Sequence, residues 1–143
     1  MKLRTTAETI SFLKSLEDQS AGFYEDMVDR YSKDEDLLLS CAKENKSFVD
    51  QIQRAYYSVI SDALEGCFSF DLEMDDYVLE TDFSGEASYK DALNQVIRME
   101  EKILDFYETA ADQSMSLMAD VPRNLKLVAK KRKKRIPKLQ ALF

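Results

Sequence analysis

The residues of this chain best suited to chemistry are two glutamates, each followed seven positions later by a tyrosine. Glu17 precedes Tyr24 and Glu100 precedes Tyr107, and each tyrosine is the middle residue of a Phe-Tyr-Glu run. Each pair lies in a run with apolar residues three and four apart, so it faces the same side of a helix as the apolar residues. A buried carboxylate needs a metal ion or a cationic side chain, because an unpaired charge is costly to bury. The repetition indicates a duplicated helix pair with a polar centre.

Several other kinds of chemistry are excluded by residue type. The chain has no histidine, which removes the commonest general base, the commonest transition-metal ligand and every Ser-His or Cys-His arrangement. No glycine-rich phosphate loop or paired-cysteine metal motif is present. Cys41 falls on an apolar helix stripe and Cys67 in a connecting segment, so we expect reduced thiols and no disulfide.

Length and composition predict one all-α domain over residues 1–143. The 143 residues are 45% apolar and 33% charged, as in a globular protein with a single core. Three glycines and two prolines leave few breaks, so the helices must be long. No apolar run approaches the roughly 20 residues of a membrane span, and the N-terminus lacks the apolar core of a signal peptide. We therefore expect a cytoplasmic protein without a membrane span.

Four helices are predicted, near residues 6–32, 35–61, 87–113 and 122–141. Thr5 or Thr6 can cap the first, and Ser84 or Ser88 the third. The connection between the first two is short, so these helices should be antiparallel neighbours.

From about residue 62 to residue 86 the apolar residues no longer recur at helical spacing, which predicts a long crossover. A connector of this length should run along the bundle, anchored by its aromatic side chains, Phe68, Phe70, Tyr77 and Phe83. The predicted fold is thus a four-helix bundle of two antiparallel pairs joined by a long crossover.

This layout is that of a ferritin-like bundle. The chain resembles rubrerythrin-type members of the ferritin-like diiron carboxylate family, in which the first and third helices each carry a glutamate followed seven residues later by a tyrosine. Glu17 with Tyr24 and Glu100 with Tyr107 match this pattern. The resemblance covers nearly the whole chain, the crossover included.

The resemblance also implies that the second and fourth helices should carry Ala, then Glu three residues later, then His after three more, as the other iron ligands. This chain departs from that pattern at all four ligand positions, which hold Asn45, Phe48, Arg132 and Arg135. Two irons need about six protein donors, and two glutamates cannot supply them. We therefore expect no bound metal and no cofactor.

The two arginines can take over the role of the metal charges. A guanidinium stays charged and offers five donors in a fork that fits a carboxylate, so Arg132 and Arg135 could neutralise Glu17 and Glu100. Phe48 and the tyrosines would then fill the remaining volume. The alternative is a rotated helix whose arginines reach solvent along their apolar stems.

The last helix is the cationic element of an acidic chain. The net charge is −7, yet residues 119–143 carry nine basic and one acidic residue. Its outward members form a predicted basic stripe, Arg123, Lys126, Lys130, Lys133 and Lys134. A solvated face paired with the acidic helices explains such a stripe, and an anionic membrane surface, an acidic partner or nucleic acid are the functional alternatives. The acidic remainder argues against nucleic acid.

Three functions remain open. The first is a ferritin-like protein without a diiron site, non-catalytic, acting through an unknown protein partner or as a homodimer. The second is a metal-dependent oxidoreductase or iron-handling protein of rubrerythrin type with an unusual ligand set and diiron as its cofactor. The third is an anion-binding module that works through the basic last helix.

Overall fold

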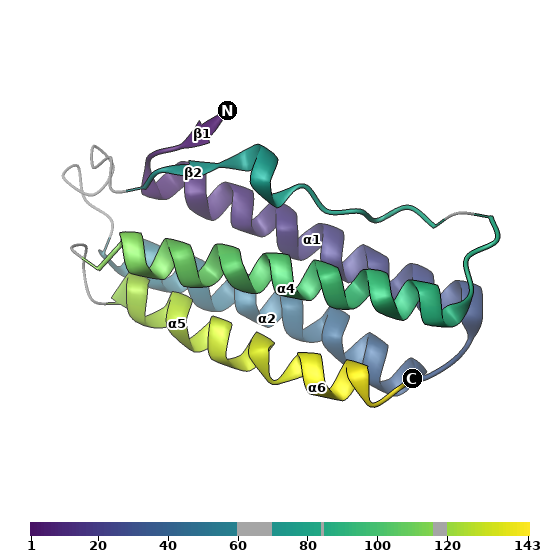
Figure 1. Cartoon of the computed structure of the whole chain (residues 1–143). Helices are drawn as coiled ribbons and strands as arrows, with labels where there is room; N and C mark the ends of the chain where they lie inside the picture. Colours follow the sequence, from purple (N-terminus) through teal and green to yellow (C-terminus); the bar gives the residue numbers. More distant parts are fainter. Residues whose placement is uncertain (60–69, 84, 116–119) are drawn as a thin grey trace.

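The computed structural model of the chain describes residues 1–59, 70–83, 85–115 and 120–143. They form an all-α four-helix bundle, which confirms the fold class expected from the sequence (Figure 1). The helices are α1 (Thr6–Tyr31), α2 (Glu35–Val59), α4 (Tyr89–Gln113), α5 (Asp120–Lys133) and α6 (Arg135–Gln140). In the described residues, no helix combines the length and apolar character that a membrane span requires.

Neighbouring helices run in opposite directions. Figure 1 shows α1 antiparallel to α2, and α4 antiparallel to α5. The turn from α1 to α2 is tight because Ser32 and Asp34 take left-handed backbone angles, with φ of 50° and 51°. Such angles are uncommon for residues other than glycine, although Asp tolerates them better than most.

Capping boxes start α1 and α4. Thr5 accepts a hydrogen bond from the backbone of Glu8 while the Glu8 carboxylate accepts one from the Thr5 backbone. Ser88 and Asp91 repeat this arrangement at α4. Of the caps considered from sequence, Thr5 and Ser88 are therefore the observed ones, and Ser84 lies outside the described residues.

The prediction of one continuous last helix over residues 122–141 is wrong. The helix is divided at Lys134 into α5 and α6. Pro137 explains the division, because it has no N–H to donate to the carbonyl of Lys133 and its ring crowds that carbonyl. Arg132 and Arg135 consequently lie on either side of the break.

The described part of the crossover begins with a short strand that sequence patterning did not predict. Strand β2 (Leu72–Glu73) pairs antiparallel with β1 (Lys2–Leu3), and the 3₁₀-helix η1 (Met74–Tyr77) follows. This pairing holds the crossover against the start of the chain.

Aromatic side chains then anchor the crossover to the helices. Phe70 is buried, Tyr77 meets Phe106 edge to face at 5.0 Å between ring centroids, and Phe83 packs on Phe23 at 4.8 Å. Phe68 and Cys67 lie outside the described residues.

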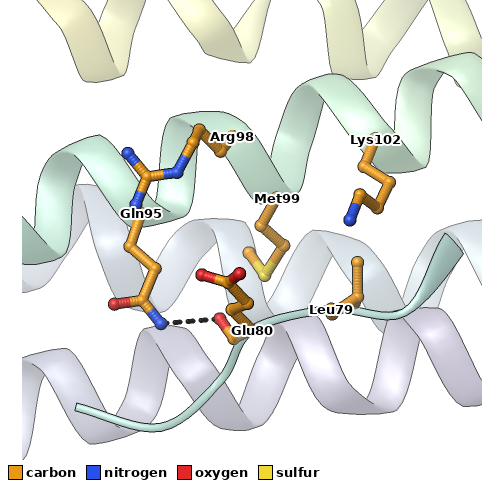
Figure 2. Close-up of a pocket in the computed structure, with 6 residues that line it drawn as sticks. All are labelled: Leu79, Glu80, Gln95, Arg98, Met99 and Lys102. Carbon is orange, nitrogen blue, oxygen red and sulfur yellow. Dashed lines mark hydrogen bonds between the residues drawn. The ribbon is translucent and has the colours of Figure 1, made fainter. Parts of the chain in front are cut away.

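Between these anchors the crossover runs along α4. The Gln95 amide donates to the Glu80 carbonyl at 2.7 Å, and Lys102 Nζ donates to the Val78 carbonyl at 2.8 Å. A small hollow of about 120 Å³ remains at this seam. In Figure 2 the Leu79–Glu80 segment faces Met99 of α4. Gln95 and Lys102 of α4 thus bind backbone carbonyls of the crossover and fix the crossover against this helix.

Candidate functional site

Five polar side chains from all four walls of the bundle meet in its core. Glu17 comes from α1, Asn45 from α2, Glu100 from α4, and Arg132 and Arg135 from the two parts of the last helix. Each is at most 3% exposed. We call these five residues the central network.

Arg132 bridges the two glutamates. Its Nε and Nη2 donate to the two carboxylate oxygens of Glu17 at 3.1 and 2.6 Å, and its Nη1 donates to Glu100 Oε2 at 2.5 Å. The side chain of Arg132 is fully buried, so the alternative in which the arginines extend to solvent does not describe this structure. One guanidinium thus contacts both carboxylates, using its forked geometry on one of them.

Arg135 ties the network to α2. Its Nη1 donates to Asn45 Oδ1 at 2.8 Å and to Glu100 Oε1 at 3.1 Å, while its Nη2 donates to Glu44 Oε1 at 2.7 Å. The Asn45 amide group in turn donates to Ser20 Oγ at 2.9 Å. Asn45 therefore directs its oxygen to the arginines and its amide group to a neutral acceptor, which satisfies both ends.

Glu44 is the site residue that sequence reasoning missed. It lies off the apolar stripe of α2, and its side chain is 45% exposed. It reaches Arg135 from the rim of the network because a long side chain next to a core position can fold over it. No local pattern pointed to Glu44, because Glu17 and Glu100 could already balance the charges of Arg132 and Arg135.

The two tyrosines are crossed between helices. Tyr24 of α1 donates to Glu100 Oε1 of α4 at 2.5 Å, and Tyr107 of α4 donates to Glu17 Oε1 of α1 at 2.8 Å. Both tyrosines are fully buried. Sequence spacing placed them beside the glutamates as fillers of volume, and the structure adds that each binds the glutamate of the opposite helix.

Phe48 fills the space between the arginines. Its ring centroid lies 5.6 Å from the guanidinium carbon of Arg132 and 5.4 Å from that of Arg135. Both distances allow a cation–π contact, which favours the charged form of a desolvated guanidinium.

The Glu100 carboxylate and the Arg132 guanidinium favour each other's charged form. Burial raises the pKa of Glu100, but Arg132, Arg135 and the Tyr24 hydrogen bond outweigh it, so this pKa lies below its ordinary value. Burial likewise lowers the pKa of Arg132, and the charges of Glu100 and Glu17 more than reverse that effect. The formal charges of the two buried glutamates and two buried arginines sum to zero.

Tyr24, Tyr107 and Cys41, which lie beside the network, are not poised to exchange a proton near neutral pH. Burial and the neighbouring Glu100 raise the pKa of Tyr24 well above its usual value, and burial with Glu17 does the same for Tyr107. Burial is also the main cause that raises the pKa of the Cys41 thiol. The tyrosines act as fixed donors, and Cys41 is a poor nucleophile.

Acid should destabilise the fold through Glu100. Because its pKa in the folded state is below the ordinary value of 4.5, its contribution is fully present above that value and is lost as pH falls through the folded pKa. We expect the free energy of unfolding, measured by urea titration from pH 7 to pH 3, to fall below about pH 4.5. The Glu100→Gln variant, though less stable, should show a shallower fall over the same range. Equal slopes for the two proteins would contradict this assignment.

The donor set does not fit a pair of iron ions. It offers two carboxylates and one amide oxygen, whereas two irons need about six donors. Both carboxylates already accept hydrogen bonds from Arg132 and a tyrosine, and two fixed guanidinium charges would repel a cation. Within the described ranges, no three His, Cys, Asp or Glu side chains come together in a way that could hold a metal ion.

The basic stripe expected from the sequence is exposed throughout but does not form one surface. Lys126, Lys130 and Lys133 line a hollow together with Glu108 and Asp112 of α4. Arg123 pairs with Asp120 on its own helix at 3.5 Å and lies beside α2 residues. Lys134, at the break between α5 and α6, lines a different hollow with Lys131 and Lys138.

Comparison of the chain with protein-family models, with curated proteins and with solved structures gives no match. The central network and its surroundings are therefore the guide to function.

Proposed function

We propose that this chain is a ferritin-like bundle of rubrerythrin type in which two arginines replace the metal ions of the centre. In this proposal the protein is not a catalyst. It serves a structural or partner-binding role, through its surface or as a homodimer.

The observation that supports the proposal is the position of the Arg132 guanidinium between Glu17 and Glu100. In the resemblance described above, this position belongs to a glutamate ligand, and that of Arg135 to a histidine. Metal ions in such a centre offset the charge of the carboxylates around them. The two guanidiniums offset the charge of the two buried carboxylates in the same place, so the network can keep the polar centre folded without metal.

The burial of the carboxylates supports a non-catalytic role. Glu17 and Glu100 are at most 1% exposed, and Arg132 together with the tyrosines occupies their oxygens. A substrate that took the place of Arg132 on these carboxylates would strand a buried charge.

Metal analysis tests the proposal directly. Protein purified without chelators should contain far less than one iron, manganese or zinc per chain by elemental analysis, because the oxygens of the centre are held by arginine and tyrosine donors. It should also turn over neither ferrous iron nor peroxide. The matched variant is Glu17→Ala, which should leave the metal content unchanged. Stoichiometric metal in the wild type that disappears in Glu17→Ala would overturn the proposal.

A further inference from the structure

A positively charged hollow opens beside the central network, between α2 and the break in the last helix. It has a volume of about 220 Å³. Its charged lining consists of Lys131, Lys134, Arg135, Lys138 and Glu44, and Cys41 also borders it. We call it the cationic hollow, since four of these side chains are cationic and one is anionic.

Its lysines are not neutralised by the protein. In the part of the chain that the structure describes, Lys134 and Lys138 form no ion pair or side-chain hydrogen bond, and Lys131 Nζ reaches only the neutral Gln51 at 3.4 Å. The hollow on the α4 side differs, because there Glu108 and Asp112 oppose Lys126, Lys130 and Lys133. Charges of one sign that converge on a concavity create a positive potential there, which attracts anions.

Arg135 supplies a buried anchor for such an anion. Its side chain is 2% exposed, and its Nε has no hydrogen-bond partner among the described residues. Its Nη2 is occupied by Glu44 Oε1 at 2.7 Å, and Glu44 is 45% exposed. Of the partners of Arg135, Glu44 can be displaced at the lowest cost in free energy, because it is exposed and its carboxylate can return to water.

We propose that the cationic hollow binds a small oxyanion of phosphate type, which takes the place of Glu44 on Arg135 and is held by Lys134 and Lys138. The carboxylate of Glu44 shows that Arg135 accepts an anionic oxygen at this point, and guanidinium with ammonium groups is the usual combination for phosphate. The volume favours a small anion, since pockets for drug-sized ligands measure about 300–1,000 Å³. This site lies beyond the proposed function and does not depend on it.

Calorimetric titration with inorganic phosphate, at an ionic strength held constant with sodium chloride, tests the inference. Wild-type protein should bind phosphate saturably. The double variant Lys134→Ala with Lys138→Ala should bind about tenfold more weakly, because it loses two charge-assisted contacts. The matched control, Lys130→Ala with Lys133→Ala, removes the same charge from the α4 side and should bind as the wild type does. Glu44→Gln should bind severalfold more tightly, because it removes the competing carboxylate.

Each other outcome overturns the inference. It fails if the wild type shows no saturable phosphate binding, if the two lysine pairs weaken binding equally, or if Glu44→Gln leaves the affinity unchanged. Binding of duplex DNA without saturable phosphate binding would also overturn it and assign these lysines to a nucleic-acid partner.

If phosphate does bind, a parallel titration with glycerol phosphate separates two sources of the anion. Tighter binding of the ester indicates a phosphorylated metabolite, and tighter binding of inorganic phosphate indicates the free ion. Metal content decides the proposed function separately, so failure of one does not imply failure of the other.

Discussion

Replacing Arg132 by alanine should lower the free energy of unfolding by about 3–5 kcal/mol, the usual cost of breaking a buried ion pair by removing one partner. The reason is that Glu17 and Glu100 would then remain fully buried, with only Arg135 left to offset them. Since a domain is typically stable by about 5–15 kcal/mol, this one change could remove a large share of the total. Urea unfolding at neutral pH measures the loss.

A surface lysine on the same helix is the control for Arg132. Lys130→Ala removes an equal charge from an exposed position and should change stability by less than about 0.5 kcal/mol. The double variant Arg132→Ala with Glu100→Gln should cost less than the sum of the two single changes, because fewer charges are stranded in the core. Strict additivity, or an Arg132→Ala protein as stable as Lys130→Ala, would show that the central network does not carry the stability assigned to it.

Restoring the six-ligand pattern should give the bundle metal-dependent stability. The variant combines Asn45→Glu, Phe48→His, Arg132→Glu and Arg135→His. It removes both buried cations and adds two carboxylates, so without metal it should be far less stable than the wild type. A ligand that binds only the folded state stabilises it by about 2.7 kcal/mol when its free concentration is 100 times its Kd.

The measurement is the melting temperature of the restored variant with and without added ferrous iron or zinc. A clear rise with metal is expected, and the wild type serves as the unresponsive reference. Adding Glu17→Ala to the restored variant removes a ligand and should shrink the rise. A restored variant whose melting temperature ignores both metals would show that these six positions do not form one site.

Helical periodicity was sufficient to place the main members of the network. Glu17, Glu100 and Arg132 lie at positions where the apolar rhythm demands a core residue, and the structure buries all three. The same rhythm predicted the four-helix bundle, since it continues for several turns in each segment. Long stripes of apolar residues predict a buried helix face reliably, because local spacing alone decides which residues share that face.

Contacts between segments that are far apart in the sequence could not be predicted from helical periodicity. The crossed bonds of Tyr24 and Tyr107 require the relative register of α1 and α4, which no local pattern specifies. The pairing of β1 with β2 joins two-residue strands about seventy positions apart, too short for any alternation to be recognised.

The division of the last helix can be predicted from the sequence by its proline. Pro137 lies within a run of otherwise consistent helical spacing, and the spacing alone suggested one continuous helix. A proline inside such a run predicts a break near the residue four positions earlier, and the helix does divide there, between Lys133 and Arg135.

The order in which the chain is synthesised gives the Glu17–Arg132 contact a further consequence. The two residues are 115 positions apart, so the first carboxylate of the network is made long before its cation. Helices α1, α2 and α4 all leave the ribosome before α5, and until then Glu17 and Glu100 would face each other with no guanidinium between them. Like charges resist burial together, so closing these three helices around the centre without the last helix should cost free energy. We therefore expect the core of the bundle to be completed when the last helix brings in Arg132 and Arg135.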